Sequence, residues 1–382
     1  MKKILASIFF FTLILISCQS ESSEKVVTPD GPIIYPIDIT AEGVDFLSQV
    51  ESISIFGFEE TEESLLKPSS LFFYHKDGVL VIEEQAGTIY VFDKSGSFVS
   101  KFNHKGDGPE EYGQMWNTVY RNGFVETYDM PKQQLVRYDL EGDFLGKLKL
   151  PHRANHLIYT GERYVLSMGN KIAEDSASNN IISVDNQGNE IDQFLPIEIP
   201  IPLAISSRIN EFRLTEEGLL FNAILTDSVM HVSNTGVRPH IRFDFGEGWF
   251  WTEDMIADGN RAMSAISRAE RDDGKVWNYS WVLGRDRIEI TYNLSFRDFR
   301  KGYIDRSTGK FYHYKYNAWK EGKPDIRTVR FEEDELLLVM TPDILEVFVN
   351  ELGKDRYQLD GGIPLDQIME SENPVIVRAK FK

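Results

Sequence analysis

The chain has 382 residues and a formal net charge of −19, from 41 basic and 60 acidic side chains. A surface this negative repels phosphate backbones, so the composition excludes nucleic acid as a partner. Cys18 is the only cysteine, which rules out an intrachain disulfide and leaves the fold to its apolar core. The common catalytic and phosphate-binding signatures are missing, so the sequence nominates no catalytic residue, no metal site and no cofactor.

The first eighteen residues have the layout of a lipoprotein signal peptide, with residues 1–17 removed. Lys2 and Lys3 precede an uncharged run, Ile4 to Ile16, which suits a signal-peptide core but is short for a membrane span. Leu15-Ile16-Ser17-Cys18 resembles the lipobox of bacterial lipoproteins. This resemblance implies a thioether-linked diacylglycerol on Cys18 and a further acyl chain, such as palmitate, on its amino group. Several chains together hold a protein on a membrane far more firmly than one.

The residues after Cys18 indicate where the lipoprotein resides. Position 19 is Gln and not Asp, so the usual signal for inner-membrane retention is absent, which favours the outer membrane of a Gram-negative cell. The sequence leaves open whether the protein faces the periplasm or the cell surface. Gln19 to Lys25 is small, polar and acidic, as in a flexible tether, and also loosely resembles acidic surface-export signals. We therefore predict a lipidated tether over residues 18–35 and a folded domain over residues 36–382.

One hairpin phrase recurs along the folded domain: an alternating apolar strand, an Asp or Ser, a few polar residues, a Gly, and another strand. The polar side chain can bond its own turn, and Gly supplies the positive φ that closes it. The turn glycines lie 46, 46, 48 and 73 residues apart. A period in the mid-forties with about four strands is typical of β-propeller blades. The turn glycines are Gly96, Gly142, Gly188, Gly236 and Gly309.

The period can be divided into individual strands, and the chain ends supply the last blade. Five hairpins plus one composite blade predict an all-β, six-bladed propeller, with an open β-sandwich array as the alternative. In the composite blade the N-terminal segment Val50–Phe58 completes three C-terminal strands and removes the exposed edge. The strands predicted for the first two blades and the last are Leu71–His75, Val79–Glu83, Thr88–Asp93, Ser97–Phe102, Trp116–Tyr120, Phe124–Asp129, Leu135–Asp139, Phe144–Leu150, Ile326–Phe331, Glu335–Met340 and Ile344–Val349.

The segment after the first blade resembles a known family. Gly106-Asp-Gly108-Pro109-Glu-Glu-Tyr112 looks like the Gly-x-Gly-Pro-x-Glu-Tyr phrase of six-bladed β-propeller lipoproteins of Gram-negative anaerobes, distant relatives of NHL-repeat propellers. The likeness covers nearly the whole mature chain in layout, and this phrase and the hairpins in detail. It implies the propeller fold and says little about chemistry, because most members of that family are uncharacterised.

The same loop is the first candidate site. It should join the outermost strand of one blade to the innermost strand of the next, on the face where propellers usually bind. Asp107, Glu110, Glu111 and Tyr112 could offer carboxylates and a ring to a ligand or cation. The structural alternative is a sharp Gly-Pro crossover in which Tyr112 is a wedge between blades.

The long interval before the last hairpin predicts an insertion at about residues 246–275, between blades 4 and 5. Thr252 could cap a helix that runs to about Arg271. Trp249 and Trp251 precede that helix and could bind a sugar or a protein, or pack the insertion. Trp277, Tyr279 and Trp281 alternate along the next strand, a pattern that favours core packing over binding.

His152 and His156 have the spacing of a zinc pair on a helix, but they follow Pro151 at a strand end, so we expect a surface loop. The function that we expect is a non-catalytic propeller on the outer membrane that binds or scaffolds a protein, peptide or glycan. The alternative is an extracellular hydrolase or lyase that acts on glycan or peptide from a site in the central funnel. The sequence leaves enzymatic activity undecided.

Overall fold

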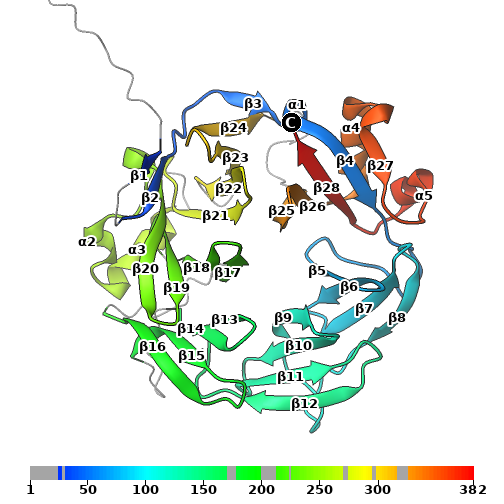
Figure 1. Cartoon of the computed structure of the whole chain (residues 1–382), viewed down its shortest axis with the longest axis horizontal. Helices are drawn as coiled ribbons and strands as arrows, with labels where there is room; N and C mark the ends of the chain where they lie inside the picture. Colours follow the sequence, from blue (N-terminus) through cyan, green and yellow to red (C-terminus); the bar gives the residue numbers. More distant parts are fainter. Residues whose placement is uncertain are drawn as a thin grey trace, which may run out of the picture.

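The computed structural model describes residues 25–27, 31–169, 178–198, 212–222, 225–269, 274–294, 298–315 and 326–382. These residues form a ring of six sheets around a central axis, which confirms the predicted six-bladed β-propeller (Figure 1). The predicted signal peptide and Cys18 lie outside the described residues. Among the helices of the described part, none has the length and apolar character needed to cross a membrane.

Blades 1 to 3 are four-stranded antiparallel sheets in which the chain runs from the innermost strand to the outermost. All eight strands predicted for blades 1 and 2 agree with the structure to within one residue at each end. The strands are β5 (Leu71–His75), β6 (Gly78–Glu83), β7 (Thr88–Asp93), β8 (Phe98–Phe102), β9 (Trp116–Arg121), β10 (Phe124–Asp129), β11 (Gln134–Tyr138), β12 (Phe144–Lys149), β13 (His156–Tyr159), β14 (Tyr164–Ser167), β15 (Asn179–Val184) and β16 (Glu190–Pro196).

Blades 4 and 5 repeat this plan, with the predicted insertion between them. Their strands are β17 (Phe212–Thr215), β18 (Gly218–Asn222), β19 (Ser228–Ser233), β20 (Gly236–Asp244), β21 (Asn278–Leu283), β22 (Arg287–Asn293), β23 (Phe299–Asp305) and β24 (Phe311–Lys315).

The recurring hairpins have the predicted turn chemistry. In blade 1, an Asp93 carboxylate oxygen accepts hydrogen bonds from the backbone N–H groups of Ser95 at 2.8 Å and Ser97 at 3.0 Å. Gly96 in that turn has a φ of +88°, which a residue with a Cβ adopts only with strain. The turns are therefore specified by a few local residues, and this explains why the sequence predicts the outer hairpins well.

The sixth blade joins the two ends of the chain. Strand β4 (Val50–Phe56) pairs antiparallel with the C-terminal strand β28 (Val375–Phe381), so the predicted closure by the N-terminal segment is confirmed. The inner two strands are β25 (Ile326–Glu332) and β26 (Glu335–Met340), also as predicted. The third strand differs, because β28 pairs with β26 in the place expected for Ile344–Val349.

The prediction of a strand over Ile344–Val349 was wrong, because this segment lies in helix α4 (Pro342–Leu352). Thr341 is the N-cap residue, Pro342 stands in the first turn and Asp343 adds an acidic group there, which is a typical helix start. The apolar residues also recur at helical spacing, and the helix buries Ile344, Leu345, Phe348 and Leu352.

Three outermost strands gain a fifth strand in parallel. Strand β2 (Ile33–Pro36) pairs with β20, β3 (Gly43–Asp45) pairs with β24, and β27 (Tyr357–Leu359) pairs with β4. A two-residue strand, β1 (Val26–Val27), pairs with β2. Part of the segment predicted as a tether, residues 18–35, thus belongs to the sheet of blade 4.

Each blade buries both of its faces against its neighbours. In blade 1, Val79 and Val81 pack toward blade 6, while Leu80 and Ile82 pack toward blade 2. All four side chains are at most 1% exposed, so an isolated blade would expose two apolar faces to water. The interface between blades 5 and 6 also includes the short helix α1 (Phe46–Gln49).

Closure of the ring can be tested on β4. Ile55 is 1% exposed and pairs with Val377 of β28. We expect Ile55→Ala to lower the free energy of unfolding by about 2–5 kcal/mol, the usual cost of truncating a buried Ile. The matched control is Glu51→Ala, an exposed position on the same strand, which should change it by less than about 0.5 kcal/mol. Equal urea unfolding curves for the two variants would show that the ring closes in another way.

Candidate functional site

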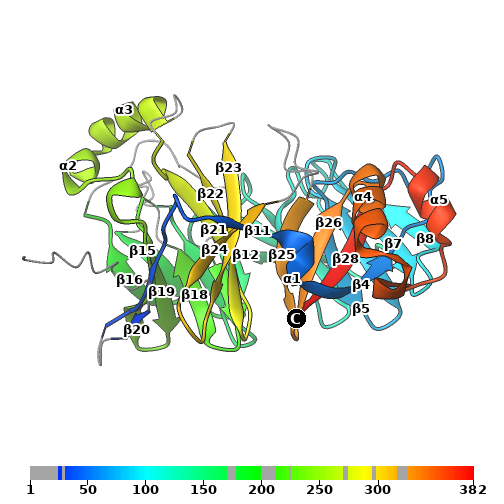
Figure 2. The same ribbon diagram turned by 90° about the horizontal axis from the view of Figure 1, so that it is seen from above.

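The two candidate sites from the sequence lie on the same face of the ring. Loop 106–112 joins β8 to β9, and the insertion joins β20 to β21, so both link an outermost strand to the innermost strand of the next blade. We call this side the crossover face, and Figure 2 shows the insertion helices projecting from it. The two links are three blades apart, so they stand on opposite sides of the axis (Figure 1).

Tyr112 anchors the first loop. Its side chain is fully buried, and its hydroxyl donates to the Gly87 carbonyl at 2.7 Å and accepts from the His104 backbone N–H at 3.0 Å. Burial raises the pKa of this hydroxyl to about 12. The ring also meets Tyr138 edge-on, with centroids 5.8 Å apart. In this structure Tyr112 is thus the wedge between blades 1 and 2 that the structural alternative describes.

The carboxylates of the loop have different surroundings. Glu111 folds back on the loop, where one of its oxygens accepts from the Gly108 backbone N–H at 2.7 Å. Asp107 and Glu110 are exposed, and the Asp107 carboxylate lies 3.7 Å from the Lys132 ammonium. The Glu110 carbonyl accepts a hydrogen bond from the Tyr138 hydroxyl at 2.5 Å. The loop backbone is therefore fixed by buried tyrosines, while Asp107 and Glu110 point outward and stay accessible.

The insertion differs in detail from the single helix that we predicted. It contains a 3-10 turn η1 (Gly246–Gly248) and two helices, α2 (Glu253–Ile256) and α3 (Gly259–Ala269). The Thr252 side chain caps α2 as expected, by accepting from the Met255 backbone N–H. A second helix begins because Asp258 accepts from the Asn260 backbone N–H at 2.7 Å, which competes with continuation of α2.

Trp251 forms a small core beneath α3. It is 5% exposed, packs with Phe250, Ala262 and Ala265, and donates its indole N–H to the Trp277 carbonyl at 2.7 Å. The two alanines let the helix approach the rings closely. Trp251 is thus enclosed in this structure, and it gives the insertion a core of its own.

Trp249 is the more accessible tryptophan of the predicted pair. It is half-buried, stacks on Phe245 with centroids 5.5 Å apart, and meets Tyr279 edge-on. Tyr279 and Trp281 are each 3% exposed in the interface between blades 4 and 5. Core packing of these two side chains agrees with the sequence pattern, whereas Trp249 keeps a surface on the crossover face.

The two histidines do not form a pair. His152 bonds to Glu190, with Nε2 and Oε2 2.7 Å apart, whereas His156 is 3% exposed and bonds to Asn117 at 3.2 Å. The expected surface loop was wrong for His156, because this residue begins β13 and is buried against β9 of blade 2. In the described ranges, no three His, Cys, Asp or Glu side chains group in a way that could hold a metal ion.

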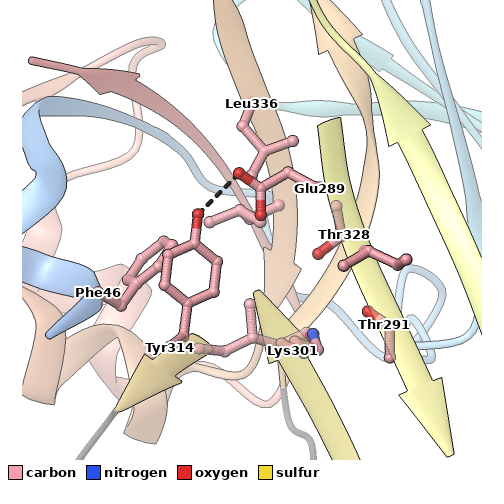
Figure 3. Close-up of a pocket in the computed structure, with 10 residues that line it drawn as sticks. Phe46, Glu289, Thr291, Lys301, Tyr314, Thr328 and Leu336 are labelled. Atoms are coloured by element: carbon pink, nitrogen blue, oxygen red, sulfur yellow. Dashed lines mark hydrogen bonds between the residues drawn. The ribbon is translucent and has the colours of Figure 1, made fainter. Parts of the chain in front are cut away.

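A polar cluster that the sequence analysis missed lies between blades 5 and 6. Glu289 of β22 is 5% exposed, and its carboxylate accepts from the Tyr314 hydroxyl of β24 at 2.8 Å (Figure 3). Lys301 of β23 donates to the Ile326 carbonyl. These side chains, with Thr291 and others, line a cavity that can hold about one water molecule. The cavity is too small for a sugar or a peptide.

The position of Lys301 is apolar in every other blade. When the blades are aligned on the turn between their two inner strands, Lys301 corresponds to an aliphatic residue in each of the other five blades. Each of these five residues is at most 1% exposed. This comparison requires the strand register, so the sequence alone could not single out Lys301. The five aliphatic residues are Ile89, Leu135, Ile181, Val229 and Ile376.

Burial favours the neutral forms of both Glu289 and Lys301. It raises the pKa of the Glu289 carboxyl to about 7, although the Arg287 guanidinium, 3.8 Å away, opposes the shift. It lowers the pKa of the Lys301 ammonium to about 8, against the attraction of Glu289. The Lys301 side chain is half-buried and lines the cavity. A pair with such pKa values could exchange a proton, although the cavity admits no larger reactant.

The pH dependence of stability tests this cluster. Between pH 4.5 and about 7 the folded protein binds the Glu289 proton and the unfolded chain releases it, so stability should fall as pH rises. Between about 8 and 10.5 the unfolded chain keeps the Lys301 proton, so stability should rise with pH. The double variant Glu289→Gln, Lys301→Met should lack both slopes in urea unfolding between pH 4 and 10.5. Identical pH profiles for the two proteins would contradict the assignment.

Comparison with known structures agrees with the propeller fold. A Bacteroides fragilis protein named for inferred export superimposes with a TM-score of 0.68 at 16% identity, over 91% of this chain and 99% of that one. A member of the DUF4221 family from Bacteroides vulgatus gives a TM-score of 0.51 at 10% identity, over 87% and 99%. A streptogramin B lyase reaches only 0.43 at 12% identity, over 75% and 79%, which is too distant to bear on function.

The family assignment rests on the sequence of the propeller itself. No curated protein matches the chain significantly. Residues 37–380, nearly the whole of the folded part, match the family described as a domain of unknown function, DUF4934. The chain is a member of the DUF4934 family.

Proposed function

We propose that this protein is a lipoprotein of the outer membrane, held there by lipid on Cys18, whose propeller binds or scaffolds a partner without catalysis. The partner would be a protein, a peptide or a glycan, and it would sit on the crossover face. The support for the anchor is the order of charge, apolar run and lipobox in the sequence.

The single observation that carries the binding role is the construction of the crossover face. The insertion has a core of its own around Trp251, so α2 and α3 form a defined projection and not a loose loop. Opposite it, buried Tyr112 fixes a loop that presents Asp107 and Glu110 to solvent. Fixed elements that hold accessible polar and aromatic groups on an otherwise regular scaffold are typical of binding sites.

The placement of these two features also limits the size of the partner. They stand at the junctions of blades 1 and 2 and of blades 4 and 5, on opposite sides of the axis. A small metabolite could not contact both, whereas a folded domain, a long peptide or a glycan chain could. Among the described residues, the enzymatic alternative, a hydrolase or lyase, has support only from the Glu289–Lys301 pair, whose cavity is too small for such a substrate.

The lipid anchor has a direct test. Cys18→Ala should abolish labelling with a fatty-acid analogue and should release the protein from the membrane fraction, because no acyl acceptor remains. Ser17→Ala, a change that the lipobox tolerates, is the control and should keep the label. Persistent labelling of the Cys18→Ala protein would exclude this anchor.

Capture of a partner tests the binding role. The triple variant Asp107→Asn, Glu110→Gln, Trp249→Ala should retain less than about a tenth of the capture from outer-membrane extract or on a glycan array, since every 1.4 kcal/mol lost is a tenfold change. Asp77→Asn, an exposed change in the β5–β6 turn, is the control and should capture normally.

A stability measurement separates surface from core in the same experiment. Trp251→Ala should lower the free energy of unfolding by about 3–5 kcal/mol because the indole is buried. Asp107→Asn and Glu110→Gln should change it by less than about 0.5 kcal/mol. Undiminished capture by the folded triple variant would remove the crossover face as the binding surface.

A further inference from the structure

The outer wall of the ring is divided into two halves. The outermost strands of blades 4, 5 and 6 are covered by β2, β3 and β27, and all three pair in parallel. The outermost strands of blades 1, 2 and 3 are β8, β12 and β16, and no described strand pairs with their outer edges (Figure 1). Backbone N–H and C=O groups on an unpaired edge are a template for another strand. The beginning of β8 is engaged by the segment after β4, because the Phe98 backbone N–H donates to the Glu59 carboxylate at 2.8 Å and the Glu59 backbone N–H donates to the Gly96 carbonyl at 2.8 Å.

Each open edge carries an exposed aliphatic side chain at the same place. Val99, Leu145 and Ile191 are each the third residue after the turn glycine, and they are 60%, 53% and 49% exposed. Among the described residues, these are three of only seven large apolar side chains with such exposure. Exposure of three aliphatic residues at one repeated position is a property of this half of the wall, and it places apolar surface beside open backbone groups.

The edges of β8 and β12 are also basic, although the chain is strongly acidic. Lys101, Lys147 and Lys149 make no salt bridge with the described residues, and each donates only to a backbone carbonyl. At one of the three edges that the chain covers itself, the charges complement each other: Asp45 of β3 stands opposite Lys315 of β24. An incoming strand on β8 or β12 would meet the same kind of lysine, so it should bring acidic side chains.

We infer that the edges of β8 and β12 bind an extended segment of another protein, which adds as a parallel fifth strand and alternates apolar with acidic residues. The apolar residues would cover Val99 or Leu145, and the acidic ones would pair with the edge lysines. The chain covers its own three edges in this parallel mode, and strand addition is a common way to bind a peptide. This docking site lies on the outer wall and differs from the proposed crossover-face site, and the two meet at Lys147, which donates to the Glu111 carbonyl of loop 106–112.

A second copy of the chain fits these edges poorly. Two-fold pairing of one edge with itself would be antiparallel, and it would bring the lysines of both copies together. The other interpretation is that the lysines and the bulges beside both edges only prevent pairing, as in many edge strands. The experiment distinguishes these possibilities.

The probe is a fluorescein-labelled octapeptide of alternating Val and Asp, with a Val-Lys octapeptide as its counterpart, both added to the full mature chain. The Val-Asp peptide should bind at least tenfold tighter, and hydrogen exchange should slow in β8 or β12 but not in β20, β24 or β4. The variant Lys101→Glu, Lys147→Glu, Lys149→Glu should reverse the preference. The control Lys76→Glu, Lys310→Glu, Lys354→Glu changes three exposed lysines away from β8 and β12 and should leave it unaltered.

Three results would overturn the inference: no binding of the Val-Asp peptide, equal binding by the charge-reversed variant, or slowed exchange only outside β8 and β12. A concentration-dependent dimer that the peptide dissociates would assign the edge to a second copy instead. The crossover-face variants should bind the peptide normally, so failure of that proposal and failure of this one give different results.

Discussion

Burial of both faces of every sheet is the constraint on which the rest of the structure depends. A blade with Val81 on one face and Leu80 on the other cannot stand alone in water, so each blade needs a neighbour on either side. The ring satisfies this need only if it closes. Five of the six junctions join neighbouring repeats of the chain, and the sixth requires β4 to reach β28 across most of the sequence. The ring can therefore close only when the composite blade forms.

The interfaces between blades are not purely apolar, and the exceptions follow the symmetry of the ring. Glu126 in blade 2 and Glu289 in blade 5 occupy the same place, three blades apart. Glu126 is well satisfied, with Arg137 at 2.6 Å, Arg121 at 3.1 Å and the Tyr164 hydroxyl at 2.8 Å. Glu289 has the Tyr314 hydroxyl at 2.8 Å but its nearest arginine at 3.8 Å.

This difference gives the two carboxylates different roles. Two close guanidinium groups compensate the burial of Glu126, which then acts as a fixed tie between blades 2 and 3. Weaker compensation leaves the pKa of Glu289 raised, and the nearby Lys301 has its own pKa lowered. The seam between blades 5 and 6, within which the composite blade packs, is thus a part of the ring whose stability should depend on pH.

The surface of the ring also differs from one part to another. The crossover face carries the added elements, and the outer wall is covered on one half and open on the other. The strand that leads back toward Cys18, β1, lies on the covered half, in the sheet of blade 4. Blade 1, which carries β8 and precedes the crossover loop 106–112, stands opposite blade 4 in the ring.

The sequence by itself determined the features that depend on a few neighbouring residues. The Asp-and-Gly hairpins, the strands around them and the cap at Thr252 are all local signals, and the structure has each of them. The closing role of Val50–Phe58 followed from the number of strands that a closed ring requires, and the structure has it too. The helix at Pro342–Leu352 was also locally encoded, by Thr341, Pro342 and Asp343, but the expectation of a fourth strand in every blade overrode that signal.

Tertiary structure alone decided what each side chain contacts. Trp249 and Trp251 look equivalent in sequence, and only the packing of α3 encloses Trp251 and leaves Trp249 half-exposed. His156 is buried because its strand packs against Trp116 and Asn117 of blade 2. Lys301 is an ordinary lysine until the strand register aligns it with five buried aliphatic residues, and Val99 becomes notable only because no described strand covers its edge. Burial and pairing are properties of segments that meet from distant parts of the chain, so no local pattern could specify them.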